Sequence, residues 1–447
     1  MMKIAKTVRA LTATAVLSVI YGTAGAESLM EVYDLARDND AQYRVFTYNY
    51  EATLENRNQS RAAYLPSVNA TGTAGMIEIV DDRQGPYETT ELSLSLNQLL
   101  FSRTAQVATK QADLTIAQAQ AQLTAAEQDL IFRAASAYFG VLAARENLVF
   151  AESERKAIEQ QLEQANRRFE VGLIAVTDVK EAQAAYDLSV AAEIVAENDL
   201  ANAREALRVM TGKEISDYLV LADDAPLIRP EPENVDEWVR TAETSNLTLR
   251  VAEYDAELAN KAIDEARAGH YPTLGAGAVY TDTHRNGGTG DAEVANIALQ
   301  LDVPIYSGGL VSSQTRQAKS LARAAAEQYE LTRRSTAQAA RNAYRGVLAS
   351  ISQVQALEQA LQSTQTAAEA TQTGFEVGTR TAVDVLGALR DTYQARANYS
   401  SARYNYIINS LGLKQAAGIL APVDLEAVNN WLRPATAADS ESKLMEN

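Results

Sequence analysis

Phe169-Glu170-Val171-Gly172 recurs later in this 447-residue chain as Phe375-Glu376-Val377-Gly378. The two stretches are offset by 206 residues, the difference between positions 375 and 169. The same offset relates further matched pairs along the chain: Arg61 and Arg267, Pro66 and Pro272, Asp178 and Asp384, Gly212 and Gly418. Residues 35–212 are therefore duplicated as residues 241–418. The period far exceeds the roughly 20 to 50 residues of solenoid repeats, so each copy must be a large assembly with its own internal order.

The N-terminus has the three parts of a secretory signal. Lys3, Lys6 and Arg9 form a cationic region, residues 10–21 are uncharged and mostly apolar, and Ala24-Gly25-Ala26 fits a cleavage site. A membrane anchor is the alternative, but the apolar run is shorter than the roughly 20 residues that span a bilayer. We predict that residues 1–26 are a signal peptide. Its removal takes away three cations and no acid, so the net charge changes from −18 to −21.

The composition excludes several classes of function. The chain has no cysteine, which excludes disulfides, thiol catalysis and N-terminal lipidation, and its only histidines are His270 and His284. A cysteine or histidine metal centre is therefore not expected, and we predict neither a metal nor a cofactor. The negative charge argues against nucleic acid as a partner. No His, Cys or paired-carboxylate group has catalytic spacing, so the chain is not predicted to be an enzyme.

Each copy follows one order: helix, strand pair, long helix, helix. Residues 28–63 contain no glycine or proline and predict a helix, and residues 235–270 predict its counterpart in the second copy. Strand patterns follow, in which apolar and polar residues alternate: Leu92, Leu94 and Leu96 in the first copy, and Ile297, Leu299, Leu301 and Val303 in the second. Polar turn sequences at 81–86 and 284–291 separate the strands of each pair.

The longest predicted elements are two helices at residues 102–170 and 312–376. Both stretches lack proline and are rich in Ala, Gln, Glu, Leu and Arg, and each would be about 100 Å long. Their alanines favour close side-by-side packing with thin seams. The helices alone are as compatible with a rod-like coiled coil that has no channel as with a channel. The strands alone are compatible with a soluble sandwich. Strands with one apolar and one polar face, together with a signal peptide, instead favour the wall of an outer-membrane β-barrel.

Aromatic residues stand where strands meet helices, at Tyr64, Phe101, Tyr271 and Tyr306, as in an interfacial girdle. With these junctions, the stretches at 169–179, 377–386 and 402–409 make the chain similar to TolC-type outer-membrane efflux proteins over nearly all of residues 27–432. The resemblance implies a mixed α+β membrane protein that forms a homotrimer. Each protomer would give four strands to one 12-stranded outer-membrane β-barrel, continued by a long periplasmic α-helical barrel.

The resemblance also implies a function and partners. Such ducts conduct drugs or proteins passively from an inner-membrane RND or ABC transporter, through a periplasmic adaptor protein, across the periplasm and the outer membrane with its lipid. They serve tripartite efflux and type I secretion systems. The alternative is a structural trimeric coiled-coil surface protein or adhesin, although strand pairs that interrupt each copy are atypical of an adhesin stalk.

The predicted organisation has five parts. We expect a signal peptide at 1–26, a first repeat at 27–213, a linker at 214–234 that contains Pro226, Pro230 and Pro232, a second repeat at 235–419, and a C-terminal tail at 420–447. The small, polar residues 435–447 at its end predict disorder.

Asp384 is the candidate for an acidic constriction. Thr381-Ala382-Val383-Asp384 is typical of a helix N-terminus, where the carboxylate satisfies free amide groups. The resemblance implies instead that three copies of Asp384 form a carboxylate ring at the periplasmic constriction, which favours cations. The family often has a second aspartate where this chain has Gly387, so a double ring is not expected. Asp391 lies on the same helical face and either compensates or is simply solvated, and we favour solvation.

Arg380 is the candidate for a gate latch. Taken alone it is a surface charge after a turn, but the resemblance implies that it bonds to Thr177 and Asp178 and holds the tip closed. The family commonly has tyrosine where this chain has Phe375, so one hydroxyl of the latch is missing. The tip residues at the two turns predict glycine C-caps, and the resemblance implies that they form grooves for the adaptor's helical hairpin: Val171, Gly172, Leu173, Val377, Gly378 and Thr379.

Overall fold

The computed structural model describes residues 26–78, 86–286 and 290–435. The predicted signal peptide up to residue 25, parts of both predicted turns between strands and the predicted disordered end from residue 436 lie outside these ranges. The first copy holds α1 (Leu29–Asn39), α2 (Ala41–Ala62), β1 (Ser67–Ile77), β2 (Tyr87–Phe101), α3 (Arg103–Glu170) and α4 (Val176–Thr211). The second holds α5 (Val235–Ser245), α6 (Leu247–Ala268), β4 (Thr273–Asn286), β5 (Ala292–Asp302), α7 (Leu310–Glu376) and α8 (Ala382–Ala416). Three short elements complete the chain: β3 (Val220–Leu221), α9 (Pro422–Asn429) and β6 (Leu432–Arg433).

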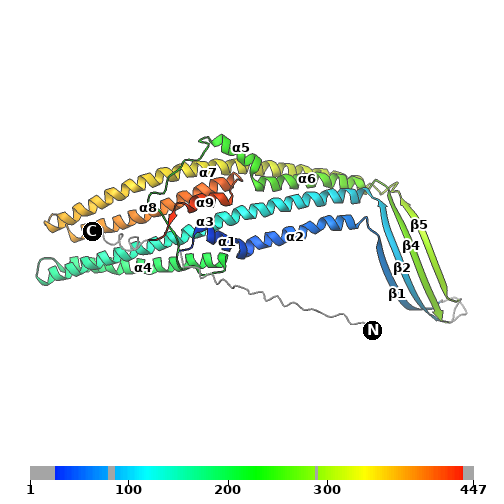
Figure 1. Ribbon diagram of the computed structural model, residues 1–447, viewed down its shortest axis with the longest axis horizontal. Helices are drawn as coiled ribbons and strands as arrows, with labels where there is room; N and C mark the ends of the chain where they lie inside the picture. Colours follow the sequence, from blue (N-terminus) through cyan, green and yellow to red (C-terminus); the bar gives the residue numbers. More distant parts are fainter. Residues whose placement is uncertain (1–25, 79–85, 287–289, 436–447) are drawn as a thin grey trace, which may run out of the picture.

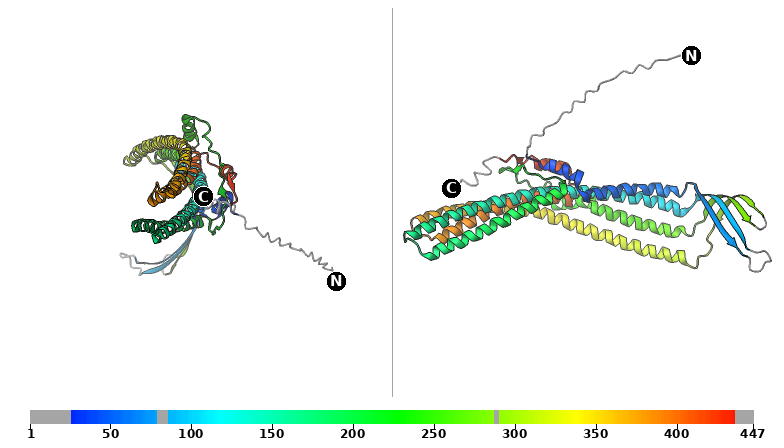
Figure 2. Two further views of the ribbon diagram at one scale, coloured as in Figure 1. Left: turned by 90° about the vertical axis from the view of Figure 1, so that its left-hand side faces the viewer. Right: turned by 90° about the horizontal axis from the view of Figure 1, so that it is seen from below.

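The molecule is strongly elongated. The four long strands lie at one end, and the turns α3–α4 and α7–α8 lie together at the other (Figure 1). Near the strands, neighbouring helices contact in the order α2-α3-α6-α7, and toward the tips in the order α4-α3-α8-α7. Viewed along the long axis, the helices follow an open arc (Figure 2). The protomer is therefore a curved wall one helix thick, as thin alanine-lined seams allow.

The two long predicted helices are present and continuous. The helix α3 has 68 residues and α7 has 67, so each is about 100 Å long at a rise of ~1.5 Å per residue. Their buried faces contain many alanines, among them Ala121, Ala126, Ala134 and Ala340. None of the helices in the described ranges has an apolar stretch long enough to cross a membrane.

The long strands form one antiparallel sheet in the order β1-β2-β4-β5. The register sets Ala70, Leu94, Tyr280 and Ala295 opposite one another, so their side chains share a face. That face is apolar over most of its length and open to solvent in the single chain, where Ile297 is 87% exposed. The outer strands β1 and β5 each pair on one side only and have 11 residues each. The sheet is thus open at both edges.

The prediction of one helix over 28–63, and of one over 235–270, was wrong at a single point in each copy. The helix ends at Asn39 and restarts at Ala41, and the Asp40 carboxylate accepts a hydrogen bond from the Tyr43 amide at 2.7 Å. In the second copy, Asn246 interrupts the helix and its side-chain oxygen accepts from the Leu249 amide at 3.0 Å. Each polar side chain caps the helix that follows it, which compensates for the backbone bonds lost at the break.

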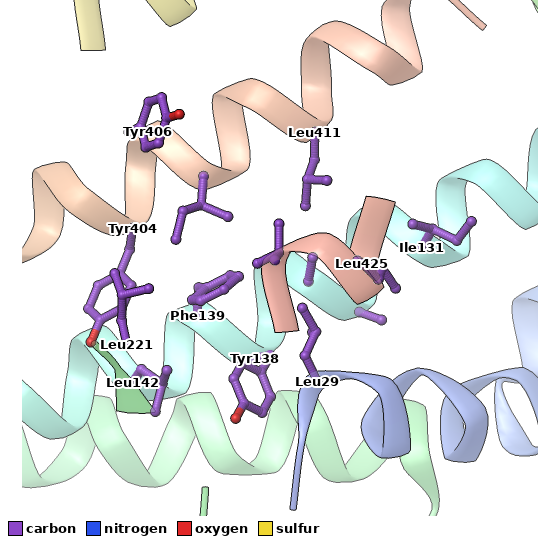
Figure 3. Packing of buried hydrophobic residues seen from close by; sticks show 14 of the residues in the cluster. Leu29, Ile131, Tyr138, Phe139, Leu142, Leu221, Tyr404, Tyr406, Leu411 and Leu425 are labelled. Atoms are coloured by element: carbon purple, nitrogen blue, oxygen red, sulfur yellow. The ribbon is translucent and has the colours of Figure 1, made fainter. Parts of the chain in front are cut away.

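The core lies midway along the molecule, where α1, α3, α4, α8 and α9 meet (Figure 3). Tyr138 and Phe139 are fully buried there in edge-to-face contact, with ring centroids 5.6 Å apart. The Tyr138 hydroxyl donates to the Leu219 carbonyl at 2.8 Å, which ties the linker to α3. Burial raises the pKa of this phenol well above its usual range.

Two glycines of this middle region occupy equivalent places in the two copies. Gly212 ends α4 and Gly418 follows α8, both with left-handed backbone at φ 69° and 74°. Each lies against the helix break of its own copy: Gly212 beside Asn39, and Gly418 beside Ser245 and Asn246. The linker and the tail also meet here, because β3 pairs with β6. The tail up to residue 435 is therefore part of the folded middle.

Candidate functional site

The two helical turns at the far end of the molecule have the same backbone. Gly172 and Gly378 both have positive φ, 77° and 79°, which other residues adopt only with strain. The Leu173 amide donates to the Arg168 carbonyl at 2.9 Å, and the Thr379 amide donates to the Gly374 carbonyl at 2.8 Å. These bonds close the last turns of α3 and α7 as glycine C-caps.

Apolar side chains project from these turns into solvent. Val171, Leu173 and Val377 are 70%, 73% and 71% exposed. Exposure of apolar side chains to water is unfavourable, and together the two turns form an apolar end face. Thr379 adds a hydroxyl to this face, but its oxygen already lies 3.0 Å from the Gly374 carbonyl. The predicted docking residues are thus together at one end of the protomer.

Asp384 lies in the first turn of α8 and acts as a cap. Its Oδ2 accepts from both the amide and the hydroxyl of Thr381 at 2.9 Å, and its own amide donates to the Thr381 hydroxyl at 3.2 Å. These hydrogen bonds, first from the Thr381 backbone and then from its hydroxyl, with nearby Arg380, lower the pKa of the carboxyl. The side chain therefore stays charged and remains exposed at the tip. Capping uses Oδ2 of Asp384, so it is compatible with a role of Oδ1 in the predicted carboxylate ring.

The positions that follow Asp384 differ in exposure and space. Gly387 has no atom within 4 Å of the place where a Cβ would stand, so this side of α8 is open. Asp391 is 67% exposed and has only a loose contact of 3.9 Å with Arg390. An exposed carboxylate beside a neighbouring arginine fits a solvated residue.

The predicted latch is not closed within one chain. Asp178 caps α4 by accepting from the Ala175 amide at 3.3 Å, and Thr177 beside it is exposed. Over the described ranges of one chain, no ion pair joins Arg380 to Asp178. The aliphatic stem of Arg380 lies instead against Gly374, where an added Cβ would be 2.8 Å from its Cγ. Arg380 as a whole is exposed at the end of the turn.

Phe375 makes a contact that the sequence did not indicate. The guanidinium carbon of Arg168, in the last turn of α3, lies 4.3 Å from the centroid of the Phe375 ring in the last turn of α7. A cation over an aromatic face at this distance is attracted by the ring's quadrupole. The contact joins the first copy of the repeat to the second at the tip.

The sheet end of the molecule has a polar hollow. It has a volume of about 630 Å³, and its polar lining residues include Asn97, Asn296, Gln300 and Asp302, on the face opposite the apolar one; small and aliphatic residues complete the lining. The hollow extends to the end of α2, because Ala62 and Ala63 also line it.

One half-buried polar group in the middle region was also missed. Glu146 of α3 accepts a hydrogen bond from the Tyr404 hydroxyl at 2.7 Å and another from the Ser400 hydroxyl, both on α8. Burial raises the pKa of Tyr404 well above its usual range, so it remains a donor. A heptad pattern alone does not distinguish such a bond from a surface carboxylate. Elsewhere in the described part of the chain, no three His, Cys, Asp or Glu side chains are grouped as metal ligands.

The chain matches the family model described as "Outer membrane efflux protein" twice, over residues 32–213 and 238–419. The two matches are again 206 residues apart, so each repeat corresponds to one copy of the family's unit.

Two relatives and one solved structure give the extent of the similarity. The outer membrane protein TolC of Vibrio cholerae is 39% identical over 430 residues, which cover 94% of this chain and 98% of TolC. The alkaline protease secretion protein AprF of Pseudomonas aeruginosa is 28% identical, over 93% of this chain and 89% of AprF. A crystal structure of CusC has the same fold, with a TM-score of 0.76, 16% identity, and coverage of 90% of this chain and 95% of CusC.

Proposed function

Because this chain belongs to the outer membrane efflux protein family, we propose that three copies of it form one continuous duct through the outer membrane and the periplasm. The chain is an outer-membrane channel protein and an exit duct for efflux and type I secretion, as its relatives TolC and AprF are. Its relatives are channel proteins and not enzymes.

The open sheet is the observation that supports a trimer. Strands β1 and β5 leave a row of backbone N–H and C=O groups unpaired, and in a membrane these groups must be bonded. Because β1 and β5 have the same length and run in opposite directions, β5 of one protomer can pair antiparallel with β1 of the next. Four strands are too few for a closed barrel, and three protomers supply the twelve that the resemblance implies.

The faces of the sheet fit this arrangement. The apolar face would contact lipid, and the polar hollow would open into the lumen. At the junction with the helices, Tyr271 and Tyr306 are 51% and 87% exposed, as expected for an aromatic girdle at the membrane interface. The helical wall, which follows an open arc, would continue the duct through the periplasm (Figure 2).

The tips would serve two purposes. The exposed apolar end face, defined by Val171, Leu173 and Val377, suits the docking of a periplasmic adaptor that connects the duct to an RND or ABC transporter. Three copies of Asp384 would form the acidic constriction, and Arg380 would reach Thr177 or Asp178 of a neighbouring protomer, since it is unpaired with Asp178 within its own.

Disulfide cross-linking tests the trimer, because the chain has no cysteine of its own. One cysteine replaces Ala70 on the apolar face of β1, and a second replaces Ala295, Ile297 or Leu299 of β5 in turn. One of these pairs should give a covalent trimer in the outer membrane. The control places the β1 cysteine at Asn69, whose side chain is on the opposite face and should not cross-link. A mass of one chain in detergent, with no cross-link from any pair, would contradict the proposal.

A planar-bilayer recording separates the duct from the alternative, a surface adhesin. The purified protein should give discrete conductance steps, because a lumen lined by polar side chains conducts ions. A trimer without conductance, even after removal of the predicted latch by Arg380→Ser, would favour the adhesin.

A further inference from the structure

We propose that Arg168 is a tip-positioning residue, which ties the two copies of the repeat together by its contact with the Phe375 ring and sets the width of the periplasmic end. The inference rests on the proposed function only where it concerns that width. The contact itself is a property of one chain.

The two copies differ at the positions that matter here. Arg168 corresponds to Gly374 at the offset of 206, and Arg380 corresponds to Ile174, so an arginine occupies a different place in each copy. In the second copy the glycine leaves room for the stem of Arg380. In the first copy the arginine itself extends from the last turn of α3 to the ring of Phe375.

The aromatic residues show the same asymmetry. Phe169 and Phe375 are equivalent, yet Phe169 is 43% exposed whereas Phe375 is half-buried with a guanidinium over its face. Duplication alone would give both rings the same surroundings. The departure from symmetry therefore marks a specific contact between the copies.

The position of the contact between Arg168 and Phe375 allows it to influence the separation of the two tips. Further from the tip, Leu386 of α8 packs on Ile158, Ala165 and Ala182 of the first copy, which holds the two hairpins together there. Arg168 and Phe375 lie in the last turns of α3 and α7, beside this apolar cluster, against which Ile174 of the first loop also packs. A contact at the free end of two long helices has the greatest leverage on the separation of the tips.

The contact also has the chemistry of a reversible restraint. A guanidinium stacked on an aromatic ring keeps much of its hydration and has no rigid bond to break. An exposed cation–π pair should favour the closed tip about two- to fivefold over the open one. It would supply the restraint between the two tip turns that a phenol at position 375 would otherwise give.

Fluorination of the ring provides the sharpest test. Replacing Phe375 site-specifically with mono-, di- and trifluorophenylalanine weakens the cation–π attraction stepwise while the ring keeps its size. Hydrogen exchange of the tip peptides, about residues 163–180 and 369–386, should become faster with each fluorine, up to the level of Arg168→Gln. Arg168→Lys should restore part of the protection. Fluorination at Phe169, over whose ring no guanidinium lies in the described part of the chain, is the matched control and should leave exchange unchanged.

Conductance is measured on the same samples. Under the inference, the open fraction should rise about two- to fivefold in the order of the exchange rates. Exchange that does not change with fluorination or with Arg168→Gln would overturn the inference, whatever the conductance. Faster exchange in a protein that never conducts, wild type included, would leave the contact in place and refute the proposed duct.

Discussion

Gly418→Ala is expected to destabilise the protein far more than the same change at Gly212, although the two glycines are equivalent in the duplication. Both have a left-handed backbone, so alanine costs about 1–2 kcal/mol at either position. At Gly212 the added Cβ would meet only the Asn39 side chain at 3.3 Å, which can rotate away. At Gly418 it would lie 2.4 Å from the Ser245 carbonyl oxygen and 2.6 Å from the Asn246 Cα, which are backbone atoms.

The backbone around Gly418 cannot retreat without losing hydrogen bonds. The Gly418 carbonyl accepts from the Gln128 side chain at 3.1 Å, and the Asn246 side chain donates to the Ala416 carbonyl at 3.0 Å. Loss of these two bonds adds about 1–3 kcal/mol to the backbone strain. We therefore expect a loss of about 2–5 kcal/mol for Gly418→Ala, against about 1–2 kcal/mol for Gly212→Ala.

Thermal unfolding of the full chain in detergent, followed by circular dichroism, measures this difference. Because membrane oligomers commonly unfold irreversibly, all samples are scanned at one rate and the apparent Tm values are compared. The decrease for Gly418→Ala should be at least twice that for Gly212→Ala. Equal decreases would show that the close approach of Ser245 and Asn246 carries no energy, and the packing argument would fail.

Three further outcomes follow from the tips and from the middle region. Arg380→Ser should raise single-channel conductance severalfold, because a latch between protomers would lose a charge-assisted bond, and equal conductance would place the latch elsewhere. Hexamminecobalt added from the periplasmic side should block the channel; Asp384→Ala should abolish the block and Gly387→Asp should strengthen it. Because the pKa of Asp384 is lowered, the block should persist below about pH 4. A block unchanged by Asp384→Ala would show that Asp384 acts only as a helix cap. Desolvation raises the pKa of Asp40, but hydrogen bonds from Arg133 and from the Tyr43 and Gln42 amides, together with the charge of Arg133, outweigh it and lower the pKa overall. The contribution of Asp40 to stability is therefore present above about pH 4 and lost as the pH falls through the folded-state pKa. Asp40→Asn should remove this acid-sensitive part of the Tm profile, and an unaltered profile would contradict the assignment.

Much of the fold could be predicted because it depends on local pattern. The offset of 206 identified the duplication, a lack of proline marked α3 and α7, and alternation marked the strands. The breaks at Asp40 and Asn246 were not predictable in this way, since a single polar residue inside a helical run gives no local signal. At each break the chain lies against Gly212 or Gly418, which are more than 170 residues away in the sequence.

The site shows the same division. The tip turns and the capping role of Asp384 follow from short motifs within one stretch of chain. The contact between Arg168 and Phe375 joins residues of different copies, and no periodic pattern in the sequence predicts it. Comparison of the copies position by position does give a signal, because an arginine stands opposite a glycine where the surrounding residues match.

The unpaired edges of the sheet constrain the order in which the protein can be made. A lone protomer that entered the bilayer would expose the free sides of β1 and β5 to lipid, and every unbonded backbone group there costs several kcal/mol. Insertion one chain at a time would therefore pass through states far less stable than the aqueous protomer. Protomers should meet through their helices in the periplasm first, and their strands should enter the membrane together. Membrane insertion of the proposed duct would then be a concerted step that follows the assembly of three protomers.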